Sequence, residues 1–265
     1  MDLIFITSDR DQAKTVEYAG VDRIMIDLEK TGKIERQGHL NTLISDHDVS
    51  DISVLRSVIQ NAELLVRTNP LSSNTAAEVC EIIDRGADRL MLPMFRSAEE
   101  VEEFVEIVKG RVPVTLLVET AAAFGRLPTI LSVAGIDDVH LGLNDLHLDM
   151  GLDFMFELFS GELVDHFART CRGRGIKFGI GGVAPIGTGM LPSELIVAEH
   201  ARLNSNCVIL SRGFRPKIDE GKESARIAVS AIRNAFAEKQ TRTNAEIDRD
   251  RAEFNKKVAE IIGAS

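Results

Sequence analysis

Short apolar runs with β-strand character alternate with segments of helical periodicity along most of this 265-residue chain. The runs are residues 3–7, 23–28, 64–66, 89–92, 114–118, 138–143, 178–183 and 207–210. Strict alternation favours parallel strands, because each helix carries the chain back to the start of the next strand. Polar residues follow nearly every run, as they do at the mouth of a barrel. We therefore predict an α/β fold, a (β/α)8 TIM barrel, with an open doubly wound sheet as the alternative.

The C-terminal part of the chain extends beyond the eighth strand–helix unit. We expect a barrel domain over residues 1–240 and a C-terminal helical extension over 241–265, with longer helices at 156–174, 217–240 and 244–262. An apolar stripe on the last helix consists of Ile247, Phe254, Val258 and Ile261. Such a stripe either packs back on the barrel or docks on another subunit, so we expect a homo-oligomer with this extension as a contact.

Composition excludes several classes of partner. The net charge of −10 argues against binding to nucleic acid or to an anionic membrane. No apolar run reaches the length of a membrane span, and the chain starts directly with strand-like residues. The three cysteines lack metal-ligand spacing, which is typical of reduced thiols. We expect a cytoplasmic protein that acts on small molecules.

Two carboxylates follow consecutive strands of the predicted barrel. Glu119 comes directly after the run 114–118, and Asp145 lies shortly after 138–143. The carboxyl ends of parallel strands meet at one mouth, so both side chains are expected to point into it. Two hard oxygen donors leave room for substrate and water around Mg²⁺ or Mn²⁺. The alternative is that each acid caps a helix or pairs with an arginine.

A second charged group is expected at the ends of strands two and three. Asp27 and Glu29 point to the same side of an extended chain, and Arg67 closes the next strand. The planar fork of an arginine suits a substrate carboxylate. Alternatively, the acids pair with Arg23 or Lys30, or with Arg67 itself. One guanidinium can hold protein on one edge and substrate on the other.

The connection after strand two, residues 31–50, is long for a compact domain, as binding loops often are. It carries His39 and His47, and His47 lies between Asp46 and Asp48. Because histidine titrates near neutral pH, His47 is the first candidate for a general base. A solvated surface histidine is the alternative.

Taken together, these residues resemble the HpcH/HpaI aldolase/citrate lyase family. Four motifs carry the resemblance, in order: Asp27-Leu-Glu29, Val66-Arg67-Thr-Asn-Pro70, Leu92-Pro93 followed by Ser97-Ala-Glu-Glu-Val, and Glu119-Thr120 with Gly142-Leu-Asn-Asp145-Leu. The resemblance implies Glu119 and Asp145 as ligands of a divalent metal. It also implies that a 2-oxo acid contacts Arg67, with further substrate contacts from Gly142, Leu143 and Asn144, and that C-terminal helices pack on neighbouring subunits.

Two positions depart from the family pattern. The pyruvate-aldolase branch has Asp-Gly-Glu-His after strand two, whereas Lys30 stands at the place of that histidine here. The citrate lyase β branch has Asp-Leu-Glu-Asp there and a lysine after Leu-Pro, where this chain has Met94. The half of the site that handles the second substrate therefore differs from both branches.

The combined prediction is a divalent-metal-dependent carbon–carbon lyase, an aldolase that acts through the enolate of a 2-oxo acid such as pyruvate. An aldehyde is the second reactant, Mg²⁺ or Mn²⁺ is the cofactor, and the catalytic residues are Arg67, Asp27, Glu29 and His47. Two alternatives stay open. One is a citrate-lyase-β-like enzyme that cleaves an acyl-CoA thioester, and the other is a non-catalytic barrel that binds a 2-oxo acid.

Overall fold

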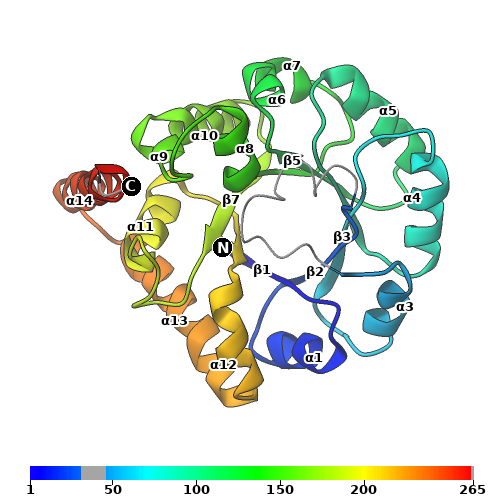
Figure 1. Ribbon diagram of the computed structural model, residues 1–265, viewed down its shortest axis with the longest axis horizontal. Helices are drawn as coiled ribbons and strands as arrows, with labels where there is room; N and C mark the ends of the chain where they lie inside the picture. Colours follow the sequence, from blue (N-terminus) through cyan, green and yellow to red (C-terminus); the bar gives the residue numbers. More distant parts are fainter. Residues whose placement is uncertain (31–45, 264–265) are drawn as a thin grey trace.

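The computed structural model describes residues 1–30 and 46–263. Eight strands of these residues form a closed, parallel barrel in chain order (Figure 1). They are β1 (Asp2–Ile6), β2 (Arg23–Asp27), β3 (Glu63–Arg67), β4 (Arg89–Leu92), β5 (Val114–Val118), β6 (Asp138–Leu141), β7 (Lys177–Val183) and β8 (Cys207–Leu210). The TIM-barrel prediction is confirmed, and the open-sheet alternative is wrong because β1 pairs with both β2 and β8.

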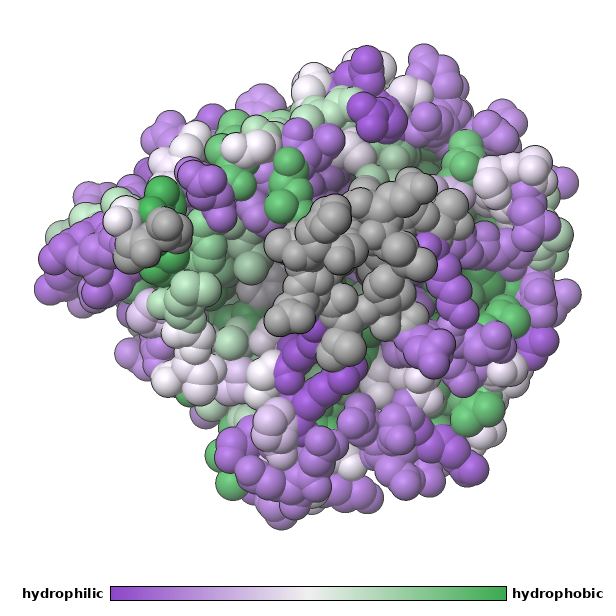
Figure 2. Space-filling model, viewed as in Figure 1, coloured by the Kyte–Doolittle hydropathy of each residue, from purple (hydrophilic) through white to green (hydrophobic). Residues whose placement is uncertain are grey.

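Helices surround the barrel and cover its outer face (Figure 1). They are α1 (Arg10–Tyr18), α3 (Ser50–Arg56), α4 (Thr75–Asp84), α5 (Ala98–Val108), α6 (Ala121–Gly125), α7 (Leu127–Ile130), α8 (Leu143–Asp149), α9 (Glu157–Ser160), α10 (Leu163–Gly173), α11 (Ser193–Leu203), α12 (Arg215–Asp219), α13 (Lys222–Gln240) and α14 (Asn244–Gly263). Among the described residues, no helix combines the length and apolar composition needed to cross a bilayer. In the same view, hydrophilic residues dominate much of the described surface (Figure 2).

The barrel interior is layered, because alternate residues of each strand point inward. Aligned pairs of β2 and β3 illustrate the layers: Arg23 lies opposite Glu63, Met25 opposite Leu65, and Asp27 opposite Arg67. The middle layer is an apolar cluster of Ile4, Met25, Leu65, Met91, Leu117 and Cys207. Charged side chains therefore lie on both sides of the apolar cluster. The lower layer is at the amino ends of the strands, and the upper layer, at their carboxyl ends, forms the mouth of the barrel.

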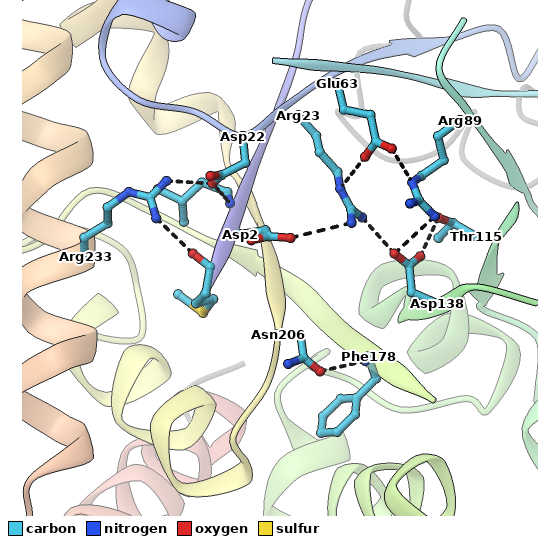
Figure 3. Close-up of polar contacts among 12 residues, drawn as sticks. Asp2, Asp22, Arg23, Glu63, Arg89, Thr115, Asp138, Phe178, Asn206 and Arg233 are labelled. Carbon is cyan, nitrogen blue, oxygen red and sulfur yellow. Dashed lines mark hydrogen bonds and ion pairs between the residues drawn. The ribbon is translucent and has the colours of Figure 1, made fainter. Parts of the chain in front are cut away.

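The lower layer is a network of ion pairs at the amino ends of the strands (Figure 3). Arg23 contacts Glu63 at 2.8 Å and Asp138 at 3.0 Å, and Arg89 contacts the same two acids at 3.0 and 3.3 Å. Burial would lower the pKa of Arg23, but the nearby acids, Asp138 foremost, raise it. Arg23 is thus engaged at the opposite end of the barrel from Asp27, so the predicted alternative of a pair between them is wrong.

Two predicted helices are interrupted. The expected helix 156–174 is divided into α9 and α10, and Glu162 between them has a left-handed φ of 60°. The expected helix 217–240 is divided into α12 and α13 at Gly221, whose φ is 114°. Glycine adopts such angles readily, whereas glutamate does so rarely, so the first break had no clear sequence signal.

The final helix α14 packs on its own barrel beside α9 and α11 (Figure 1). Phe254 and Val258 are each only 1% exposed, and the Phe254 ring lies 5.4 Å from that of Phe159. Arg242, just before α14, donates from Nη2 to the backbone oxygen of Ala198 in α11 at 2.7 Å, which supports the same arrangement. The apolar stripe is therefore used within the chain, and its role in an oligomer contact stays a prediction.

Candidate active site

The upper charged layer gathers side chains from the carboxyl ends of β2, β3 and β5 and from the start of α8. Asp27 and Arg67 are the last residues of β2 and β3, and Glu119 directly follows β5. Each is two residues beyond an inward-facing member of the apolar cluster, namely Met25, Leu65 or Leu117. Because side chains alternate along a strand, the three groups point into the same space.

Arg67 is held on one edge by Asp27. Its Nε and Nη2 donate to the two carboxylate oxygens of Asp27, each at 2.8 Å, while Nη1 lies 3.4 Å from Glu29 Oε2. Burial would lower the pKa of Arg67, but the charge and hydrogen bonds of Asp27 outweigh it and raise the pKa. Both predicted contacts of Arg67 with these acids are present. A guanidinium has five N–H donors, and the bonds to Asp27 use one on Nε and one on Nη2. The remaining N–H groups of Nη1 and Nη2 lie along the other edge.

Glu119 is a deeply buried carboxyl group, with 2% of its surface exposed. Burial raises its pKa to about 8; Arg67 lowers the pKa, and Glu29 and Asp145 raise it further. Its Oε1 accepts a hydrogen bond from the backbone N–H of Met94 at 3.1 Å. Negative neighbours and little solvent make this a place where a cation would stabilise the ionised carboxylate.

Asp145 lies in the first turn of α8, and its charge acts on Glu119. The chain between them comes close to Glu119 at Gly142, where an added Cβ would lie 2.8 Å from Glu119 Cβ and 3.0 Å from its Oε2. Any side chain at Gly142 would therefore displace the carboxylate. Glycine at this position keeps the space beside Glu119 free of side-chain atoms.

The donor set fits a divalent cation. Two carboxylates supply the hard oxygen ligands that Mg²⁺ and Mn²⁺ prefer. Within residues 1–30 and 46–263, no group of three or more His, Cys, Asp or Glu side chains is arranged to hold a metal ion. Two carboxylates, Glu119 and Asp145, would leave coordination positions for substrate and water, which suits a metal that binds a chelating acid.

His47 lies beside this group and is 7% exposed. Its Nδ1 is 3.0 Å from the backbone nitrogen of Asp27, which donates the hydrogen bond. An acceptor at Nδ1 requires that the neutral ring carry its proton on Nε2. For His47 to accept a proton at Nε2, as a general base would, the ring must change tautomer and lose its bond to Asp27. His39, the other predicted candidate, lies outside the described residues.

The remaining predicted substrate contacts are Gly142, Leu143 and Asn144. The N–H of Gly142 donates to Val118 O at 2.9 Å, so this residue acts through its missing side chain. Leu143 is buried, and its side chain occupies space that Gly181 leaves open, since a Cβ on Gly181 would collide with it. Asn144 lies partly exposed in the first turn of α8.

Sequence reasoning missed the contribution of Met94. In the sequence this residue stands out only because a lysine is usual there in one branch of the family, yet its backbone N–H donates to Glu119. This N–H is aimed by a left-handed φ of 57° at Met94. Methionine gives no signal for that conformation, whereas the preceding Leu-Pro pair does mark a change of chain direction.

The fold and the mouth define a parallel (β/α)8-barrel protein whose acidic site lies at the carboxyl ends of the strands. More particularly, the chain belongs to the HpcH/HpaI aldolase/citrate lyase family, whose sequence profile matches residues 3–178. That match spans most of the barrel and includes Asp27, Glu29, Arg67, Glu119 and Asp145.

Individual relatives are distant. A 4-hydroxy-2-oxo-heptane-1,7-dioate aldolase of Escherichia coli is 28% identical over 110 residues, which cover 30% of this chain and 42% of that enzyme. The match therefore spans less than half the length of this curated relative. A solved family protein from Burkholderia cenocepacia J2315 superposes with a TM-score of 0.63 at 16% identity, covering 89% of this chain and 93% of that one. The citrate synthase SbnG gives a TM-score of 0.61 at 17% identity, covering 88% and 93%. These two likenesses show the shared barrel fold.

Proposed function

We propose that this protein is a divalent-metal-dependent aldolase that cleaves or forms a carbon–carbon bond next to a 2-oxo acid such as pyruvate. Family membership supports a lyase of the aldolase or citrate lyase type. The observation that carries the proposal is the buried Glu119, whose pKa is raised to about 8 by burial and by the negative charges of Glu29 and Asp145. A carboxylate in that setting is matched to a cation.

Glu119 and Asp145 are the residues that would hold Mg²⁺ or Mn²⁺. When bound, the cation would act as a Lewis acid toward negative charge that develops on the 2-oxo acid. Gly142 keeps the space beside Glu119 free of side-chain atoms. The backbone N–H of Met94 fixes one oxygen of Glu119 and so orients the carboxylate.

Arg67 would bind the carboxylate of the 2-oxo acid. Asp27 occupies its Nε/Nη2 edge with two hydrogen bonds of 2.8 Å, which fixes the plane of the guanidinium. A side chain that is already ordered loses less entropy when it binds substrate. The Nη1/Nη2 edge then offers a pair of parallel donors to the substrate carboxylate.

Proton transfer would involve Glu29 and His47. Two hydrogen bonds of 2.8 Å join Asp27 to Arg67, and Glu29 Oε2 lies 3.4 Å from Nη1 of the same guanidinium, so both acids adjoin the proposed binding position of the 2-oxo acid. The tautomer of His47 that Asp27 favours presents Nε2–H, which would donate a hydrogen bond to the oxygen of the aldehyde. A base role for His47, as predicted from the sequence, requires the other tautomer.

An acyl-CoA lyase is the second candidate. The Asp27-Leu-Glu29 segment resembles the citrate lyase β branch more than the pyruvate-aldolase branch. Both enzymes would stabilise an enolate, but they differ in which carbon acid loses its proton. A non-catalytic binding barrel would bind pyruvate without exchanging any proton.

Proton NMR in heavy water separates these three functions. A pyruvate aldolase should exchange the methyl protons of pyruvate for deuterium when Mg²⁺ or Mn²⁺ is present, and chelator or Glu119→Gln should stop the exchange. An acyl-CoA lyase should exchange the α-protons of acetyl-CoA instead. A pyruvate signal that persists with each of several divalent metals would reject the pyruvate-aldolase proposal.

A further inference from the structure

A cavity of about 330 Å³ lies beside the mouth, at the carboxyl ends of β2 and β3 and against the first turns of α4. Part of its wall continues directly from the site: Leu28 follows Asp27, Lys30 follows Glu29, and Asn69 comes two residues after Arg67. The volume falls at the lower end of the range for small-molecule pockets. The proposed metal ligands Glu119 and Asp145, and Arg67, are not among the described residues that line this cavity.

His47 connects the cavity with the charged residues of the mouth. The ring is one wall of the cavity, and its Nδ1 accepts the hydrogen bond from the backbone of Asp27. Asp27 in turn holds Arg67, where the 2-oxo acid is proposed to bind. A molecule in the cavity would thus contact a residue that directly adjoins the proposed 2-oxo-acid site.

The described part of the cavity wall carries more acidic than basic side chains. Of the described residues that line the cavity, Asp48, Glu78 and Glu81 are acidic and Lys30 is basic, and Glu81 forms an ion pair with Arg85 at 2.8 Å. Glu78 accepts hydrogen bonds from both the backbone and the side-chain nitrogen of Asn69, at 3.0 and 2.9 Å, so its carboxylate is fixed in place. An excess of negative charge repels a second carboxylate, while fixed acceptors suit hydroxyl groups.

We propose that this cavity is the subsite for the aldehyde, and that it takes a small, hydroxylated, uncharged aldehyde rather than one that carries a carboxylate. This inference rests on the proposed aldolase function. It also distinguishes the chain from its Escherichia coli relative, whose name specifies a heptane-1,7-dioate, a compound with a carboxylate at each end. The apolar patches of Leu28, Val49 and Ala77 would pack against the short carbon chain.

The reaction at this subsite balances without an oxidant or reductant. In condensation, the methyl carbon of pyruvate loses a proton and forms a bond to the carbonyl carbon of the aldehyde. The carbonyl π bond breaks, and its oxygen takes up a proton to become a hydroxyl group. Cleavage is the reverse, with the same atoms.

The test combines aldol condensation with pyruvate proton exchange, because exchange needs no aldehyde. Glyceraldehyde, glycolaldehyde and succinic semialdehyde are the probes. We expect wild-type kcat/KM for glyceraldehyde to exceed that for succinic semialdehyde by about tenfold or more. Ala77→Trp fills the cavity from the exposed face of α4. The factor by which Ala77→Trp lowers kcat/KM for glyceraldehyde should be about ten times the factor by which it lowers the rate of pyruvate proton exchange.

A charge reversal provides the second variant. Glu81→Lys should raise the ratio of kcat/KM for succinic semialdehyde to that for glyceraldehyde by about fivefold or more. The control Glu102→Lys changes the same charge on the exposed face of α5 and should leave the ratio unchanged.

The outcomes are distinguishable. Absence of pyruvate exchange in the wild type overturns the proposed function and this subsite together. Normal exchange combined with unaltered aldehyde kinetics in both Ala77→Trp and Glu81→Lys overturns the subsite alone. A wild-type preference for succinic semialdehyde overturns the substrate class.

Discussion

Glu119→Gln should stabilise the metal-free protein while abolishing its activity. Glutamine keeps an oxygen acceptor for the Met94 N–H, which Glu119 Oε1 accepts at 3.1 Å, but removes the buried charge. The pKa of Glu119 is raised from 4.5 to about 8, mainly by burial. The folded protein therefore binds more protons than the unfolded chain between these pH values, and the free energy of unfolding of the wild type falls as pH rises through this window.

The raised pKa of Glu119 also determines how much Glu119→Gln should stabilise the metal-free protein. Relative to a neutral side chain, the buried Glu119 costs about 2 kcal/mol at pH 6 and about 5 kcal/mol at pH 9, where it is ionised in both states. The stabilisation by Glu119→Gln should thus grow by about 3 kcal/mol between pH 6 and pH 9. The control Glu102→Gln, on the exposed face of α5, should change little at either pH.

Urea unfolding in the presence of chelator measures these free energies directly. Added Mg²⁺ or Mn²⁺ should then stabilise the wild type but not Glu119→Gln, because a ligand that binds only the folded state raises its stability. A stability difference between wild type and Glu119→Gln that stays constant from pH 6 to pH 9 would refute the buried-charge reasoning.

Three further predictions concern the substrate, the histidine and the tail. Arg67→Lys keeps the charge but loses the fork, so kcat/KM should fall by the equivalent of about 2–3 kcal/mol; an unchanged value rejects the role of Arg67. His47→Asn keeps an acceptor for the Asp27 N–H but removes Nε2–H, so it should slow aldol cleavage and spare metal binding. Full activity of this variant would leave Lys30 or solvent as the better candidate for proton transfer at the aldehyde oxygen. Removal of the chain from Thr243 onward should lower the oligomeric state in light scattering, and an unchanged number of subunits would count against a contact through α14.

The fold was predictable because it depends on local periodicity. Alternating strand and helix patterns, together with acids just after the strands, were sufficient to place Asp27, Arg67 and Glu119 in one mouth. Inward-facing residues two apart on one strand lie in successive layers, so Asp27, Arg67 and Glu119 each lie one layer above a member of the apolar cluster.

Details that depend on packing between distant segments were not predictable. The local sequence does not predict the left-handed backbone of Met94, and it does not predict the close approach of Gly142 to Glu119. The tautomer of His47 follows from a hydrogen bond across 20 residues, and the partners of Arg23 come from other strands. Such features are set by three-dimensional neighbours rather than by residue type.

The most direct test of the proposed metal site is a titration with Mn²⁺ followed by electron paramagnetic resonance, in the presence and absence of pyruvate. Wild-type protein should bind one Mn²⁺ per chain, and pyruvate should alter the spectrum of the bound ion because it would share the coordination sphere. The double variant with Glu119→Gln and Asp145→Asn should leave the Mn²⁺ free in solution. Binding by the double variant at the wild-type level would contradict the assignment of these two carboxylates as the metal site.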